Sequence, residues 1–446
     1  MSQFEAHKQK LSTDNYVVGI IGLGYVGLPL AHAFHQSGVR VLGFDIDPYK
    51  IECLARGENY LKHLGSEMVT ALSGSKRFEA TTDFSRLAEP DAILICVPTP
   101  LGTHREPDLS YVVNSGRDIG RTLRRGQLIV LESTTYPGTT RGDLLPAMLA
   151  ARPSGAEKLE LGKDFFVAFS PEREDPGRKT HNTKSTPKLT GGLDAASGEL
   201  SALLYQRAIE KVIHVSTAEV AEAAKILENT FRAVNIAMVN ELKVLLTEMG
   251  IDVWEVIDAA ATKPFGFMPF YPGPGLGGHC IPIDPFYLTW KAREVGKPTR
   301  FIELAGEINH TMPDYVVSRT VSALNDRSKS LRGSRILVLG LAYKPDIDDV
   351  RESPSFELIE KYSDLGAHVD YNDPLVAHTR RMRRHDLKMH SVPLSAESLA
   401  SYDAVVVSTN HSSYDWQMIA DNSKLIIDSR NAMRRIKGKR DHIVSA

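Results

Sequence analysis

The stretch VVGIIGLGYVG, residues 17–27, decides the fold of this 446-residue chain. Its apolar first half is typical of a buried strand, and a helical pattern follows at 28–36. Gly22 permits a tight turn, Gly24 lets the backbone approach a phosphate, and Gly27 allows the helix and the strand to pack closely. The stretch therefore predicts the first βαβ unit of a dinucleotide-binding domain, in which the loop residues Gly22, Leu23, Gly24, Tyr25, Val26 and Gly27 bind the dinucleotide at the start of the helix.

An acidic residue, Asp45, follows the next apolar run, 39–44, and lies 23 residues beyond Gly22. A carboxylate at this distance accepts hydrogen bonds from the adenosine ribose and repels a 2′-phosphate. We therefore expect NAD rather than NADP as the cofactor. The alternative is a structural glycine turn in which Asp45 only caps a helix.

The first half of the chain alternates short apolar runs, at 92–97, 128–131 and 165–169, with helical patterns. This alternation predicts a parallel sheet covered on both faces. From 217 to 249 apolar residues recur at helical spacing without proline or glycine, which predicts one long helix or two nearly continuous ones. Helical patterns return after a loop rich in glycine and proline, 264–285.

From Arg335 the alternation of strands and helices resumes and echoes the first half. The turn at 340–345 lacks the three glycines, and Asn372 stands where we expect the ribose acid, so we expect no second dinucleotide there. Lys344 in this turn is suited to a diphosphate. The predicted fold class is α/β, with two doubly wound Rossmann-like domains joined by a central helical domain, and the predicted bounds are 1–215, 216–328 and 329–446.

Composition narrows the class of protein. Lysine and arginine number 53 against 55 acidic residues, a net charge of −2, which argues against nucleic acid as a partner. No apolar run approaches the roughly 20 residues of a membrane helix, and residues 1–15 lack the apolar core of a signal peptide. Cys53, Cys96 and Cys280 have no metal-like spacing, so we expect no metal and a cytoplasmic protein.

Two polar sites in the first two thirds of the chain are suited to catalysis. Lys225 and Asn229 are four residues apart on the long predicted helix and share one face, where a lysine and an amide can stabilise an oxyanion. The alternative is a solvated helix face. Glu172 directly follows a predicted strand and is placed to shuttle protons, or else is a surface carboxylate.

Cys280 follows Gly277 and Gly278, which allow the backbone to come close to a ligand. A thiolate beside a nicotinamide cofactor can add to an aldehyde, and the adduct can be oxidised again to a thioester. Cys280 is therefore a candidate nucleophile. Asp284, four residues later, either orients a water or caps a helix that begins at Pro285.

These motifs, taken in order, resemble the UDP-glucose/GDP-mannose dehydrogenase family over nearly the whole chain. The resemblance implies a central domain that forms a dimer or a larger homo-oligomer, and a C-terminal domain that binds the nucleotide of a UDP-sugar. It assigns the catalytic roles to Cys280, Lys225, Asn229, Asp284 and Glu172. Beyond the glycine loop, the residues that it places at NAD are Asp45, Lys50, Pro98, Thr99, Ser133, Thr134 and Arg351, and those at the substrate are Glu172, Arg173, Lys225, Asn229, Tyr271, Gly273, Gly275, Gly277 and Lys344.

One departure from the family pattern concerns Pro176, which stands where the enzymes for UDP-glucose commonly carry a second glutamate. Glu174 or Asp175 is a candidate to replace it. The form Ser170-Pro171-Glu172-Arg173 resembles the branch that acts on UDP-N-acetylhexosamines.

The resemblance implies oxidation of C6 of a UDP-N-acetylhexosamine, with N-acetylglucosamine preferred, to the uronic acid with two NAD, and a product used in polysaccharide synthesis. The alternatives are the N-acetylgalactosamine or glucose nucleotide as substrate, a two-electron hydroxyacid dehydrogenase, and a non-catalytic sensor of nucleotide sugars.

Overall fold

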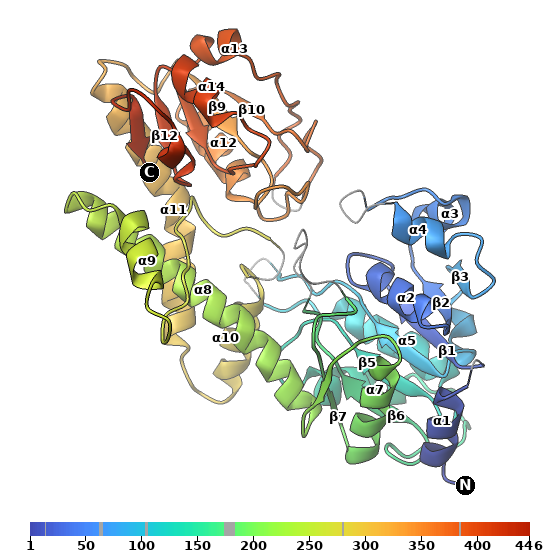
Figure 1. The fold of residues 1–446 in the computed structure, drawn as a ribbon. Helices are drawn as coiled ribbons and strands as arrows, with labels where there is room; N and C mark the ends of the chain where they lie inside the picture. The colour runs from blue at the N-terminus through green and yellow to red at the C-terminus, as the bar shows by residue number, and fades with distance from the viewer. Residues whose placement is uncertain (14, 62–65, 103–105, 174–182, 279–280, 383–384) are drawn as a thin grey trace. The chain divides into compact units, whose positions relative to one another are not determined.

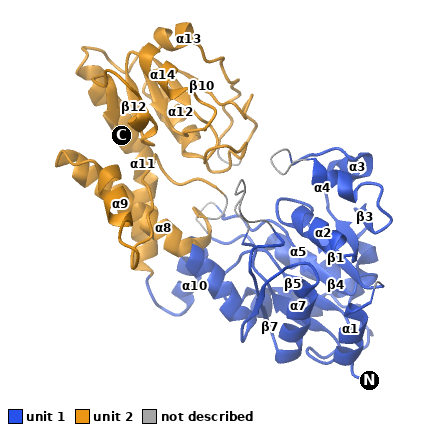
Figure 2. Ribbon diagram, viewed as in Figure 1, with its two compact units in different colours: residues 1–228, 286–298 blue, residues 229–285, 299–446 orange. Residues whose placement is uncertain are grey.

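The computed structural model describes residues 1–446 except 14, 62–65, 103–105, 174–182, 279–280 and 383–384 (Figure 1). The chain divides into two compact units (Figure 2). The first unit comprises residues 1–228 and 286–298, and the second comprises residues 229–285 and 299–446. The predicted long helix is confirmed as one continuous element, α8 (Ala218–Glu248), which contributes residues to both units.

The first unit is built on a twisted sheet with the strand order β3-β2-β1-β4-β5-β6-β7-β8. Neighbouring strands are parallel except β6 and β7, which are antiparallel. The predicted parallel sheet is thus confirmed for β1 to β6. The last two strands, β7 and β8, are parallel to each other and run in the reverse direction, which the sequence did not indicate. The strands are β1 (Val17–Ile21), β2 (Arg40–Phe44), β3 (Phe78–Thr81), β4 (Ala92–Ile95), β5 (Leu128–Leu131), β6 (Phe166–Phe169), β7 (Lys188–Gly192) and β8 (Val212–His214).

Both faces of the central part of this sheet are buried because β1, β4, β5 and β6 are apolar at nearly every position. Val18 and Ile20 pack in a core cluster with α2 and α7, whereas Ile93 and Ile95 pack in a second cluster with α5 and α6. Each such side chain contributes roughly 1.5–3 kcal/mol by leaving water. The helices of this unit besides α8 are α1 (Gln3–Leu11), α2 (Gly27–Gln36), α3 (Pro48–Arg56), α4 (Glu67–Leu72), α5 (Ser110–Thr122), α6 (Leu145–Ala150), α7 (Ala195–Gln206) and α10 (Asp284–Glu294), whose first residues belong to the second unit.

The second unit contains a parallel sheet with the order β10-β9-β11-β12-β13. Its first four strands repeat the order β2-β1-β4-β5 of the first unit, so the echo between the two halves of the sequence is confirmed. The strands are β9 (Arg335–Leu339), β10 (His368–Asn372), β11 (Ala404–Val407), β12 (Ile426–Asp428) and β13 (Ile443–Ser445). The helices are α9 (Val253–Ala261), α11 (Arg300–Asn325), α12 (Pro354–Asp364), α13 (Ala396–Ser401) and α14 (Trp416–Asn422), together with most of α8.

The comparison of the two sheets corrects one prediction. The glycine turn after β9 donates an amide hydrogen to the carbonyl of Asn372, just as the turn after β1 donates to Phe44. The counterpart of Asp45 is therefore Asp373, and the prediction that Asn372 takes its place is wrong by one residue. Asp373 is buried, and its carboxylate accepts hydrogen bonds from the turn and from His411. The Asp373 carboxylate thus makes these hydrogen bonds within the second unit.

Candidate active site

The dinucleotide loop has the geometry that its glycines predict. Gly22 has a φ of 92°, and a Cβ there would lie 2.5 Å from the Cys96 carbonyl oxygen. A Cβ at Gly27 would lie 1.9 Å from the Gly22 carbonyl oxygen, so close packing requires glycine. At Gly24 a Cβ would meet no atom within 4 Å. The three positions therefore serve the turn, the packing and an open approach to the backbone, which suits a pyrophosphate.

Asp45 lies at the carboxyl end of β2 with its side chain buried. Its carboxylate accepts hydrogen bonds from the amide of Leu23 at 2.9 Å and from the ammonium of Lys50 at 2.8 Å. The loop, the acid and the lysine that were predicted to bind NAD are therefore brought together.

The turns after β4 and β5 bring three further predicted residues together. The hydroxyl of Thr99 donates to the Thr134 carbonyl at 2.8 Å, and the hydroxyl of Ser133 donates to the Val97 carbonyl at 2.7 Å. The Thr99 carbonyl in turn accepts a hydrogen bond from the hydroxyl of Tyr287 on α10. Pro98 in the same turn is exposed.

Lys225 is not on a solvated helix face. Only 8% of its surface is exposed, and its ammonium donates a hydrogen bond to the Glu172 carbonyl at 2.5 Å. The Glu172 side chain is 16% exposed, so it is not a surface carboxylate either. Arg173 donates its amide to the Glu172 carboxylate and pairs with Glu228. The structure therefore joins Lys225 to the segment that follows β6.

A buried charged cluster beside Glu172 was not predicted. The ammonium of Lys188 lies 2.5 Å from Glu132 Oε2 and 3.9 Å from Glu172 Oε2. The hydroxyl of Tyr205 donates to the other oxygen of Glu132. Burial raises the pKa of Glu132, and Lys188 opposes that shift. Burial alone would lower the pKa of Lys188, but Glu132 and Glu172 outweigh it and raise this pKa, which keeps the ammonium charged.

In the second unit Asn229 and Asp284 form a buried pair. The Asn229 amide donates to Asp284 Oδ2 at 2.6 Å, and 7% and 2% of the two residues are exposed. Asp284 is also the first residue of α10. The helix that was expected to begin at Pro285 therefore begins at Asp284, so this residue lies inside its first turn, and its carboxylate holds the amide predicted to stabilise the oxyanion.

The glycines of the predicted substrate loop pack against the rest of the second unit. A Cβ at Gly277 would lie 2.4 Å from the Tyr343 side chain, and a Cβ at Gly275 would lie 3.1 Å from Pro354. The Gly278 amide donates to the Arg351 carbonyl at 2.9 Å. Gly277 and Gly278 are the two that the sequence predicts to let the backbone approach a ligand. The contacts show a further reason for them, which is the close approach of the loop to the turn that follows β9.

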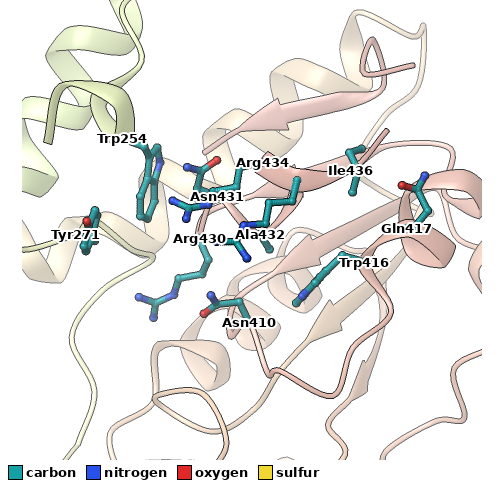
Figure 3. Close-up of a pocket in the computed structure, with 11 residues that line it drawn as sticks. Trp254, Tyr271, Asn410, Trp416, Gln417, Arg430, Asn431, Ala432, Arg434 and Ile436 are labelled. Carbon is teal, nitrogen blue, oxygen red and sulfur yellow. The ribbon is translucent and has the colours of Figure 1, made fainter. Parts of the chain in front are cut away.

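The same unit contains a pocket of about 570 Å³ that combines aromatic and cationic side chains (Figure 3). Tyr271, a predicted substrate contact, lies in it and stacks on Trp254 at 5.5 Å between ring centroids. Arg430 also lines the pocket, next to Gly273, where a Cβ would lie 2.3 Å from its guanidinium. Aromatic faces and arginines are the groups that bind bases and phosphates. The other lining residues are Asn410, Trp416, Gln417, Asn431, Ala432, Arg434, Arg435 and Ile436.

Four further residues were singled out in the sequence. Arg351 lies in the second unit and pairs with Asp349 at 2.6 Å. Lys344 is half-buried, with its ammonium 5.8 Å from the centre of the Tyr343 ring. Cys280 and Pro176 lie outside the described residues.

Within the described ranges no group of three or more histidine, cysteine or acidic side chains is placed to bind a metal. The helices described here include none that is long and apolar enough to cross a bilayer.

Comparison with known proteins identifies the class. Residues 16–209, 219–311 and 337–435 match the NAD binding, central and UDP binding domains of the UDP-glucose/GDP-mannose dehydrogenase family. The chain belongs to this family and is an NAD-dependent UDP-sugar dehydrogenase.

Individual relatives cover almost the whole chain. The chain is 35% identical to the UDP-N-acetyl-D-glucosamine 6-dehydrogenase of Pseudomonas aeruginosa over 94% of this chain and 96% of that protein. It is 32% identical to the UDP-N-acetyl-D-mannosamine dehydrogenase of Escherichia coli K12 over 94% of this chain and 99% of that one. The solved UDP-D-ManNAc dehydrogenase of Pyrococcus horikoshii superposes with a TM-score of 0.84 at 31% identity, and the match covers 96% and 98% of the two chains.

Proposed function

We propose that this protein oxidises C6 of UDP-N-acetylglucosamine to the uronic acid, and that the product serves polysaccharide synthesis. The observation that carries the proposal is the burial of Lys225 and Asn229, one turn apart on α8, each bonded to a second predicted catalytic residue. A solvated lysine and asparagine would fit a sensor as well as an enzyme. A buried ammonium that donates to a backbone carbonyl and a buried amide that donates to a carboxylate are suited to stabilise charge that develops on a reacting oxygen.

The proposed mechanism divides the four-electron oxidation into two hydride transfers. NAD, when bound, accepts one hydride in each of them. Cys280 adds to the C6 aldehyde as a thiolate, and the thiohemiacetal becomes a thioester after the second transfer. Lys225 and Asn229 stabilise the oxyanion of the tetrahedral adducts. Glu172 takes a proton from the water that releases the acid, and Asp284 holds Asn229 in place.

The proposed substrate subsite is the pocket that Tyr271 and Arg430 line. Stacking of Trp254 on Tyr271 gives a flat apolar face, and the arginines give positive charge for a diphosphate. The relatives named for N-acetylglucosamine and N-acetylmannosamine support an acetamido sugar. The manno epimer is therefore the second candidate substrate, ahead of the galacto epimer and UDP-glucose.

The test of this function is a panel of the four UDP-sugars with NADH counted against the sugar consumed. We expect two NADH per UDP-N-acetylglucosamine, with the uronic acid identified by mass. The epimers serve as matched controls because only one configuration changes. One NADH per sugar would contradict the thioester route and favour a two-electron dehydrogenase, and no NADH would favour a sensor.

We also propose three domains, at 1–215, 216–328 and 329–446, and a homodimer formed through the middle one. Four apolar side chains on the part of α8 in the second unit, and a fifth directly after its end, are 37–60% exposed. Their spacings of seven, four, three and four residues place them on one helix face, which suits packing against the same face of a second copy. They are Phe231, Met238, Leu242, Leu245 and Met249.

We expect Leu245→Glu to convert the dimer to a monomer, because a carboxylate in the centre of this face must be desolvated on association. Light scattering after size-exclusion chromatography measures the mass. Glu241→Gln, at an exposed position outside the apolar face, is the control and should remain dimeric. A Leu245→Glu protein that stays dimeric would place the interface elsewhere.

A further inference from the structure

Lys188 occupies a place in the fold that brings it to the catalytic edge of the first sheet. It is the first residue of β7, and β7 is antiparallel to β6, so it lies where β6 ends. Phe169 pairs with Gly191 in this register, and continuing the register by three residues sets Glu172 opposite Lys188. The reversed strand thus delivers a cation to the edge at which the parallel strands deliver Glu132 and Glu172.

We propose that Lys188 is a positioning residue, whose charge holds the Glu172 carboxylate in place for the hydrolytic step. The inference rests on the proposed function, in which Glu172 receives the proton of the attacking water. At 3.9 Å the ammonium acts on Glu172 through its charge, whereas it makes its short contact, 2.5 Å, with Glu132. Glu132 and Tyr205 thus hold the lysine in position.

The cost of burying this cluster supports a functional role. Lys188 is 6% exposed and Glu132 is 1% exposed. A buried ion pair of this kind contributes little to stability, since apolar residues of similar volume often serve the fold equally well. A positive charge beside a proton acceptor has a direct effect, however, because it favours the ionised form of the carboxyl group.

Several charged and titratable groups face Glu172 and Lys188. Glu172 faces Lys188, the ammonium of Lys225 at its carbonyl, and the amide of Arg173. Lys188 faces Glu132 and Glu172, and its ammonium lies 5.2 Å from the centre of the Tyr205 ring. The Cys96 thiol is also nearby, and burial raises its pKa, so it stays neutral and adds no charge. Lys188 is therefore the cation in this set that acts on the Glu172 carboxylate from across the sheet edge.

The step that depends on Lys188 is hydrolysis of the proposed thioester. The water oxygen bonds to the thioester carbon, the carbon–sulfur bond breaks, and the sulfur leaves as a thiolate. Glu172 takes the proton that the water loses. A protonated Glu172 cannot take this proton, so the rate falls on the acidic side of the pH profile. Removal of the neighbouring cation should move that acidic limb to higher pH.

The experiment compares wild type, Lys188→Met, Lys188→Arg and the double variant Glu132→Gln/Lys188→Met. Single-turnover reactions with UDP-N-acetylglucosamine and NAD follow NADH, acid release and the covalent enzyme adduct by mass, from pH 5 to pH 9. We expect the acidic limb of acid release in Lys188→Met to move up by roughly one pH unit or more. Below both limbs acid release should fall by about tenfold, with the adduct accumulating, and the first hydride transfer should remain near wild type.

If Lys188→Met fails to fold, the double variant tests the role of Lys188 instead, because it removes the paired carboxylate together with the cation. It should show the shifted limb, and Lys188→Arg should restore the wild-type profile. An unchanged limb in the folded Met variant or in the double variant overturns the role of Lys188. If wild type itself yields one NADH per sugar, the proposed function fails instead, so the two failures are distinguishable.

Discussion

The Cys280→Ser variant should lose formation of the uronic acid by a factor on the order of 10³ or more, while it still binds NAD and the UDP-sugar. A serine hydroxyl is scarcely ionised at neutral pH, so it adds poorly to the aldehyde, and an ester bond is a less reactive acyl donor than a thioester. The loss should appear in the acid product and in the second NADH. Mass spectrometry of the product and rapid-mixing absorbance of NADH measure the two.

Two variants serve as controls for Cys280→Ser. Cys53, buried on α3 of the first unit, is a matched cysteine outside the proposed machinery, and Cys53→Ser should keep acid formation within about twofold of wild type. Lys225→Met should slow acid formation by about 10²–10³-fold without changing the ratio of NADH to acid, because it removes oxyanion stabilisation rather than the covalent route. Full acid yield from Cys280→Ser would refute the thioester mechanism.

The two sheets could be predicted from the sequence because the patterns that specify their strands are local. Runs such as 17–21 and 336–339 are apolar throughout, the turns after them carry glycine, and the helices between them are amphipathic. The sequence could assign Lys225, Glu172, Asn229 and Asp284 to one catalytic site, but it could not predict which of them form hydrogen bonds with each other. The two hydrogen bonds join residues that are 53 and 55 positions apart in the chain.

The residues that sequence reasoning missed are those whose role depends on non-local pairing. Lys188 begins a strand whose reversed direction no local pattern specifies, so its place beside Glu132 was not predictable. Arg430 is a different case. It lies shortly after the end of β12, as Glu172 lies shortly after the end of β6, and the same rule about the carboxyl ends of parallel strands would have selected it.

The largest expected effect on stability concerns Lys243, on the part of α8 in the second unit. It is 0% exposed, and in the described part of the chain its ammonium has no hydrogen-bond partner. The ring of Tyr315 lies 6.0 Å away. Burial lowers the pKa of Lys243 to about 7; Asp428 opposes this shift, and the nearby arginines add to it.

The sign of the pH dependence follows from this lowered pKa. Between pH 7 and the ordinary lysine pKa of about 10.5, unfolded Lys243 holds a proton that the folded protein does not, so the free energy of unfolding rises with pH across this window. At pH 7 and below, burial of Lys243 lowers the free energy of unfolding by its full amount. We therefore expect Lys243→Met to raise the free energy of unfolding by about 1–4 kcal/mol at pH 7, and the gain should shrink toward pH 10.

Chemical denaturation at pH 6, 7, 8.5 and 10 measures this effect, with the second unit followed by the fluorescence of Trp254 and Trp416. Lys439→Met is the matched control, because its side chain is 77% exposed and should leave stability within about 0.5 kcal/mol of wild type. A Lys243→Met protein that is less stable than wild type would show that the ammonium is compensated in the folded state. A gain in stability independent of pH would assign the effect to packing, because methionine then fills the site better than a neutral lysine.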